Sequence, residues 1–127
     1  MIDKIKKICK IHECKLILMN KYDTSYYDEK ITTIGLSIMN KYNKPRSDKQ
    51  LALVFCHELA HHIQFTEFNV WPDGKNLYEV LALEWEAERM AYFLCQQYFP
   101  NIKLHHRNFN WCRKREDVEF LRDWYKI

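Results

Sequence analysis

The chain has 127 residues, of which 47% are hydrophobic and 29% charged, and its net charge is +3. This balance is typical of one folded domain spanning residues 1–127 and excludes a mainly disordered chain. The net charge is too small for nucleic-acid binding to be inferred from charge alone. The 2 glycines and 3 prolines are too few for a collagen-like or turn-rich all-β protein, so we expect helices to dominate.

The first part of the chain predicts a helix followed by a small sheet. Isoleucines recur at every third position from Ile2 to Ile11 between lysines, which indicates an amphipathic helix. Residues 15–19 and 31–39 are rich in apolar and β-branched side chains, and the polar stretch between them resembles a hairpin connection. We therefore expect a small antiparallel sheet. Gly35, in the second strand, fits a bulge, a close backbone approach or simple tolerance of a glycine.

A long buried helix is predicted next. Ser47 and Gln50 have the spacing of a capping box, in which each side chain accepts a hydrogen bond from the other residue's backbone N–H. Residues 51–65, which follow, are apolar on nearly every face. A helix of this kind belongs in the middle of a domain, so its polar residues need an explanation.

A second long helix is predicted after a turn at residues 71–74. Asn76 and Glu79 give a looser start signal, and the helix should run over residues 77–98, before Pro100. In the remaining tail, residues 117–125 predict a short surface helix.

The five cysteines and the absence of long apolar runs bear on the cellular compartment. The cysteines are odd in number and contain no Cys-x-x-Cys pair, which favours buried, reduced thiols over disulfides or a zinc ribbon. Residues 1–11 contain no apolar run of the length typical of a signal peptide, and no stretch approaches about 18 apolar residues. We therefore expect a cytoplasmic protein that does not enter a membrane.

The first long helix carries the pattern His-Glu-x-x-His at residues 57–61, followed by His62. His57 and His61 are one helical turn apart, so their imidazoles point the same way and can hold one Zn²⁺ ion at about 2.0 to 2.1 Å. Glu58 lies about 100° round the helix, where it can reach a metal-activated water as general base. His62 is about 100° from His61, which suits a residue beside the ligands, or a partly exposed one, better than a ligand.

The second long helix offers the third ligand. Winding it at about 100° per residue places Glu84 and Glu88 together on the flank of an apolar stripe, with Glu86 on the other side. We expect Glu84 to coordinate the ion, Glu88 to accept a hydrogen bond from the outer nitrogen of a ligand histidine, and Glu86 to be solvated. Ala87 and Ala91 would allow the two helices to approach closely.

These motifs resemble the gluzincin zinc peptidases, in particular the short ImmA/IrrE-type metallopeptidase domains. The resemblance covers residues 30–100 and rests on the matches at residues 52–61 and 84–91. It implies an α+β, mainly helical zincin-like fold, with Zn²⁺ held by His57, His61 and Glu84 and with Glu58 as catalytic acid/base. The sequence departs from the family pattern at Glu88, where the family usually has Asn or Asp.

The resemblance also implies an activity and a biological setting. The expected protein is a zinc-dependent endopeptidase acting on a protein or peptide substrate, such as a regulatory protein, and it looks like a minimal catalytic core of the phage or mobile-element type. Residues 31–39, as an edge strand, would bind an extended substrate by backbone pairing. The oxyanion needs a further donor, and four residues are candidates: His105, His106, Tyr92 and Tyr78.

Two alternatives belong to other functional classes. The first is a zinc-containing, non-catalytic interaction protein that binds a host or regulatory partner. The second, which the low net charge disfavours, is a nucleic-acid-binding protein that stacks a base on Trp111. Its contact patches would be formed by Lys4, Lys6, Lys7, Lys10, Arg107, Arg113, Lys114 and Arg115.

Overall fold

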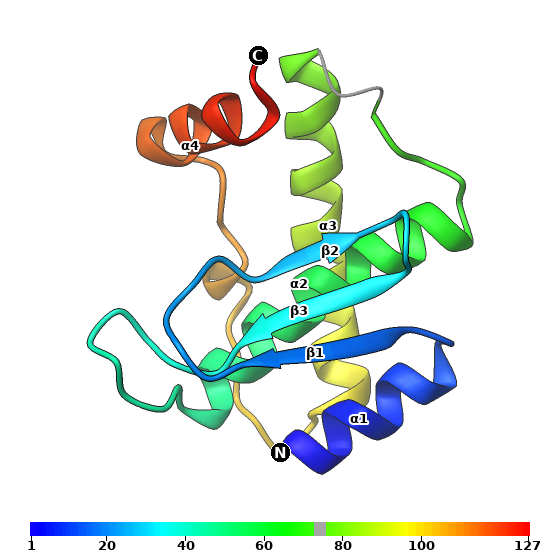
Figure 1. The fold of residues 1–127 in the computed structure, drawn as a ribbon, viewed down its shortest axis with the longest axis vertical. Coiled ribbons are helices and arrows are strands. Elements are labelled where there is room, and N and C mark those ends of the chain that lie inside the picture. The colour runs from blue at the N-terminus through cyan, green and yellow to red at the C-terminus, as the bar shows by residue number, and fades with distance from the viewer. Residues whose placement is uncertain (73–75) are drawn as a thin grey trace.

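The computed structural model describes residues 1–72 and 76–127 and confirms the α+β class, with helices dominating (Figure 1). The elements in chain order are α1 (Ile2–Ile11), β1 (Lys15–Met19), β2 (Tyr26–Asp28), β3 (Thr33–Ser37), α2 (Asp48–Thr66), α3 (Leu77–Tyr98), a 3-10 turn η1 (His106–Asn108) and α4 (Arg115–Tyr125). The turn expected at residues 71–74 lies partly outside the described residues. Within them, no helix is both long and apolar enough to cross a membrane.

The sheet is mixed, so the predicted antiparallel sheet is wrong in its topology. Its strand order is β1-β3-β2, with β1 parallel and β2 antiparallel to β3. The segment expected to be a hairpin connection contains β2, a strand of only three residues flanked by polar ones. Residues 31–39 therefore supply the central strand, all of whose residues are buried, and the proposal of substrate pairing there is also wrong.

Gly35 allows a close contact within this sheet. It pairs with Tyr26 of β2, and a Cβ atom at position 35 would lie 2.2 Å from the Tyr26 ring. The approach is made by a side chain rather than by the backbone. The ring of Tyr26 thus lies over β3 in a position that only glycine leaves open.

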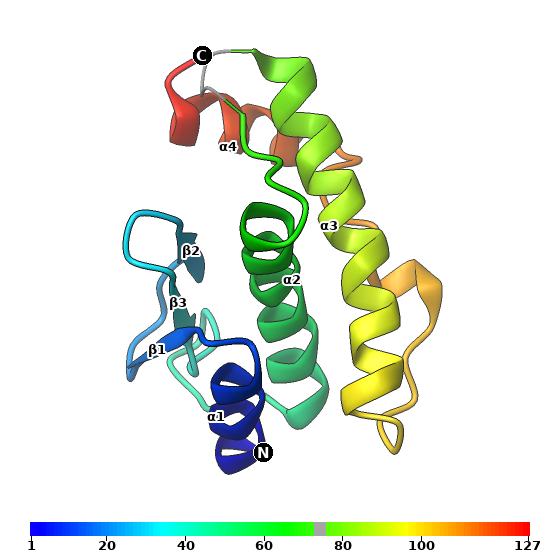
Figure 2. The ribbon, with the colours of Figure 1, turned by 90° about the vertical axis from the view of Figure 1, so that its right-hand side faces the viewer.

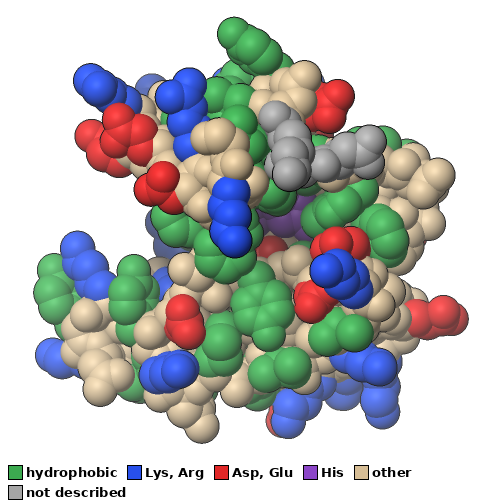
Figure 3. Space-filling model, turned by 45° about the horizontal axis from the view of Figure 1, so that its top comes forward, with side chains coloured by type: hydrophobic (Ala, Val, Ile, Leu, Met, Phe, Trp, Pro, Cys, Tyr) green, Lys and Arg blue, Asp and Glu red, His purple; other side chains and the backbone are tan. Residues whose placement is uncertain are grey.

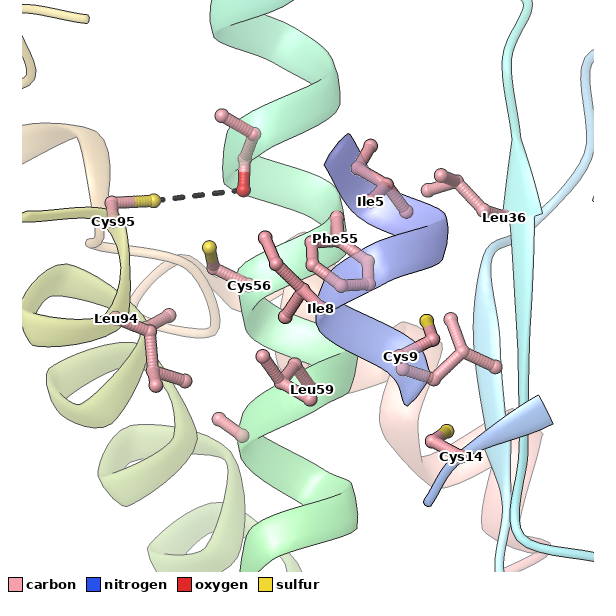
Figure 4. Close-up of a cluster of buried hydrophobic side chains, with 14 of the residues drawn as sticks. Ile5, Ile8, Cys9, Cys14, Leu36, Phe55, Cys56, Leu59, Leu94 and Cys95 are labelled. Atoms are coloured by element: carbon pink, nitrogen blue, oxygen red, sulfur yellow. Dashed lines mark hydrogen bonds between the residues drawn. The ribbon is translucent and has the colours of Figure 1, made fainter. Parts of the chain in front are cut away.

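The helix α2 lies between the sheet and α3 (Figure 2). This position explains why α2 is apolar on nearly every face. Figure 4 shows the core around it, where Phe55 and Leu59 of α2 meet side chains from α1, the sheet and α3. Ala87 and Ala91 are completely buried, as expected for two closely packed helices. All five cysteines are free and buried, which confirms that prediction.

The caps place the two long helices in the predicted register. The Ser47 hydroxyl accepts a hydrogen bond from the Gln50 backbone N–H at 3.2 Å, and the Gln50 side chain accepts one from the Ser47 N–H at 3.1 Å. The Asn76 side chain accepts hydrogen bonds from the backbone of Tyr78 and Glu79 at the start of α3. These local signals fix where each helix begins, and hence which faces carry the polar motifs.

Candidate metal centre

Three side chains of α2 and α3 converge at one point. The Nε2 atoms of His57 and His61 are 3.1 Å apart, and Oε2 of Glu84 lies 2.9 Å from the first and 3.2 Å from the second. Three ligands held tetrahedrally at 2.0 to 2.1 Å would be separated by about 3.3 to 3.4 Å. The observed distances are close to this value, so His57, His61 and Glu84 could hold a metal ion. We call these three residues the metal group.

Glu88 orients the first of these ligands. Its Oε1 atom accepts a hydrogen bond from Nδ1 of His57 at 2.6 Å, while its Oε2 atom accepts one from the backbone N–H of Trp111 at 3.2 Å. The Trp111 ring packs edge-on against His57, with 5.5 Å between ring centroids. The structure therefore places Glu88 where it was expected, whereas Trp111 is part of the site's wall rather than a free surface for stacking a base.

Gln64 orients the second ligand, a role that the sequence analysis missed. Its amide nitrogen donates to the Leu83 carbonyl at 2.9 Å, which leaves its oxygen to accept from Nδ1 of His61 at 2.9 Å. The signal was present in the sequence, because Gln64 is a polar residue three positions after His61 on a buried helix. This contact also joins α2 to α3 beside the metal group.

These outer hydrogen bonds set the protonation of both rings. A carboxylate and an amide oxygen can only accept, so Nδ1 carries the proton in His57 and in His61. In the neutral tautomers, the inner Nε2 atoms then present lone pairs to each other and to Glu84. Three acceptors meet at one point, and either a further proton on one ring or a metal cation would compensate them.

The pKa values of His57 and Glu84 also show that this site favours positive charge next to a carboxylate. Burial lowers the pKa of His57, but its hydrogen bonds with Glu84 and Glu88 outweigh burial and hold that pKa well above the usual value. Burial raises the pKa of Glu84, yet the charge of His61 and the hydrogen bonds from both rings bring it far below normal. For Glu58, burial raises the pKa of the carboxyl.

His62 and Glu86 lie away from the three ligands. The Tyr27 hydroxyl donates to Nδ1 of His62 at 2.9 Å, and Nε2 of His62 donates to the His12 carbonyl at 2.7 Å. The hydrogen-bond partners of His62 are thus Tyr27 and His12 rather than a ligand, because the turn of about 100° from His61 points its ring toward β2 and the end of α1. Glu86 is exposed and pairs with Arg89, as expected for a solvated residue.

The metal group lies in a cleft of about 530 Å³, and Glu58 lines the same cleft. Figure 3 shows histidine surface at the bottom of a hollow that hydrophobic side chains border. One wall comes from residues 22–27, which include two residues of β2, and the other from Asn108, Phe109, Trp111 and α4. The opening is thus bordered by segments that lie far apart in the sequence.

The expected oxyanion donors are not part of this cleft. His105, His106, Tyr92 and Tyr78 are absent from its lining, and Tyr78 is 82% exposed. Tyr125 of α4 lines it instead. Burial, together with the charges of Glu84 and Glu58, raises the pKa of Tyr125, so its phenol keeps its proton and can donate a hydrogen bond at neutral pH.

The chain matches no protein-family model, and it matches no curated protein and no solved structure closely enough to indicate kinship. The interpretation of the cleft therefore depends on the geometry of its own residues.

The first prediction compares the buried Glu84 of α3 with the exposed Glu86 of the same helix. Glu84→Ala removes one of three converging ligand atoms, so we expect it to lose stoichiometric zinc, while Glu86→Ala keeps one zinc per chain. Metal content after dialysis, with circular dichroism to verify folding, measures both. Loss of zinc from Glu86→Ala alone, or undiminished zinc in Glu84→Ala, would contradict the assignment.

The second prediction concerns the residue that orients His57. Glu88→Gln replaces a carboxylate acceptor by an amide that donates from one side, so we expect zinc affinity to fall about 10- to 100-fold. Competition titration with a chromogenic chelator measures the affinity. Glu86→Gln on the same helix is the matched control and should bind zinc as the wild type does; equal affinities in the two variants would reject the role of Glu88.

Proposed function

We propose that the protein is a zinc-dependent metallopeptidase that hydrolyses a peptide bond in a protein or peptide substrate. The observation that carries the proposal is the combination, in one open cleft, of three converging ligand atoms with the carboxylate of Glu58. Two imidazoles and one carboxylate form a donor set typical of catalytic zinc, and they leave a coordination position for a substrate or a water molecule.

Zinc, when bound, would polarise the scissile carbonyl and lower the pKa of the attacking water. His57, His61 and Glu84 hold the metal in place, and Glu88 and Gln64 keep the two rings in the tautomer that binds it. Glu58 takes a proton from the water while the water oxygen attacks the carbonyl carbon. Glu58 then passes that proton to the amine nitrogen as the C–N bond breaks.

Tyr125 supplies the further donor that the reaction needs. Negative charge develops on the carbonyl oxygen as water attacks, and a protonated phenol in the cleft can stabilise it by a hydrogen bond. Tyr125 belongs to α4 and lines the cleft together with the three ligand residues and Glu58. This role replaces the four donors expected from the sequence.

The edge of β2 offers a place for the substrate backbone. Among the described residues β2 pairs only with β3, so its other edge is available, and Tyr26 and Tyr27 line the cleft. An extended peptide that adds a strand there would pass directly over α2 and its metal group.

The third prediction tests hydrolysis against binding alone. Glu58→Gln removes the proton acceptor but no metal ligand, so we expect peptide cleavage to fall at least about 100-fold with zinc content unchanged. The assay counts new peptide termini by mass spectrometry after incubating zinc-loaded protein with a mixture of proteome-derived peptides. Glu86→Gln is the control. A biological effect that persists in Glu58→Gln would favour a zinc-containing interaction protein.

The fourth prediction concerns the phenol of α4. Tyr125→Phe deletes one hydrogen-bond donor that acts in the transition state, so we expect kcat to fall about 10²- to 10³-fold with KM nearly unchanged. Tyr22→Phe, at another tyrosine that lines the cleft, should keep kcat within about twofold. A rise in KM with unchanged kcat for Tyr125→Phe would instead assign the phenol to substrate binding.

A further inference from the structure

The helix α4 has two faces of opposite character. The residues that line the cleft are spaced as one side of a helix: Asp117, Phe120, Leu121, Trp124 and Tyr125. Apart from Val118, which is partly buried, the rest of the helix is charged and exposed, and it includes an ion pair between Arg115 and Glu119. An amphipathic helix normally buries its apolar side in a core. Here that side borders a cleft.

Only part of the apolar side of α4 is used to attach the helix. Leu121 is 2% exposed and packs in a small cluster with Val80 and Leu81 of α3 and with Cys112. Phe120 and Trp124 are 40% and 52% exposed, and their rings stack on each other with centroids 5.9 Å apart. These two rings add little to the core, so they leave a large apolar surface facing the cleft.

The two rings are connected to the metal group by a third. The Trp111 ring lies 6.4 Å from that of Phe120 and 5.5 Å from that of His57, measured between centroids. A line of aromatic rings therefore runs from a metal ligand to the mouth of the cleft. We call Trp111, Phe120 and Trp124 the aromatic face.

The opposite wall of the cleft is the edge of the sheet. Residues 22–27 line it, and their backbone can pair with an extended peptide, as argued above. Figure 2 shows α4 beyond the end of α2 and β2 beside that end, in separate parts of the fold. The side chains of a peptide bound along β2 would alternate between the two faces of the sheet, so that one set of them would enter the cleft that α4 borders.

We propose that the aromatic face determines specificity by binding a bulky apolar side chain of the substrate, such as Phe, Leu or Met, next to the scissile bond. This inference rests on the proposed peptidase function and adds the class of substrate. Aromatic rings of this size gain most by covering apolar area, and a small or acidic side chain would leave them in contact with water.

The first experiment profiles cleavage by zinc-loaded protein in a mixture of proteome-derived peptides. We expect bulky apolar residues to be enriched within two positions of the cleaved bond. The variant Phe120→Ala/Trp124→Ala should lose this enrichment, while Glu119→Ala/Arg122→Ala, on the charged side of α4, should keep it. Cleavage by the wild type without such enrichment, or unchanged enrichment in the aromatic variant, overturns the inference and leaves the peptidase proposal standing.

The second experiment needs no turnover. Hydroxamates of N-acetylated Phe, Ala and Asp differ in one side chain and share a zinc-binding group, so their affinities for the zinc-loaded protein report the pocket alone. We expect the Phe compound to bind at least about tenfold more tightly than the Ala compound, and the ratio to fall below about threefold in Phe120→Ala/Trp124→Ala. Equal affinities in the wild type reject the aromatic face as an apolar site. Preference for Phe in a protein that cleaves no peptide supports the site and rejects the peptidase.

Discussion

The convergence of three electron-pair donors between α2 and α3 is the constraint on which the rest of the site depends. Burying two imidazoles and a carboxylate without compensation would cost several kcal/mol for each charged group. A cation among Nε2 of His57, Nε2 of His61 and Oε2 of Glu84 would satisfy all three. It also requires the two helices to be close, which the completely buried Ala87 and Ala91 permit. The metal group and the helix packing therefore support each other.

The central position of α2 explains how one apolar helix carries so many polar residues. Successive residues point in directions about 100° apart, so each polar side chain meets a different neighbour. His57 and His61 face α3, Glu58 faces the cleft, and His62 bonds to Tyr27 and to the carbonyl of His12. The position of His62 thus attaches the sheet and the end of α1 to the helix that bears the site.

The sequence predicted what local rules determine. Ser47 and Asn76 set the starts of α2 and α3, and helical winding then brought Glu84 to the histidines, Glu88 to Nδ1 of His57, and Glu86 to solvent. Strand pairing could not be predicted, because β2 has only three residues in a polar stretch and its partner is chosen by non-local contacts. The position of Tyr125 in the cleft could not be predicted for a similar reason. Periodicity identifies an amphipathic helix over residues 117–125, but it does not say which element faces its apolar side.

The proposed chemistry and the proposed specificity have separate structural origins in this fold. The metal group and Glu58 belong to α2 and α3, whose packing forms the main core, whereas Phe120 and Trp124 belong to a helix attached through the small cluster around Leu121. The two parts meet at residue 111, where the backbone N–H of Trp111 holds Glu88 and its ring lies between His57 and Phe120. If the proposal holds, changes on the exposed part of the aromatic face would therefore alter substrate preference without disturbing His57, His61 and Glu84. Changes at Trp111 affect both, because the same residue positions a ligand's partner and begins the apolar wall.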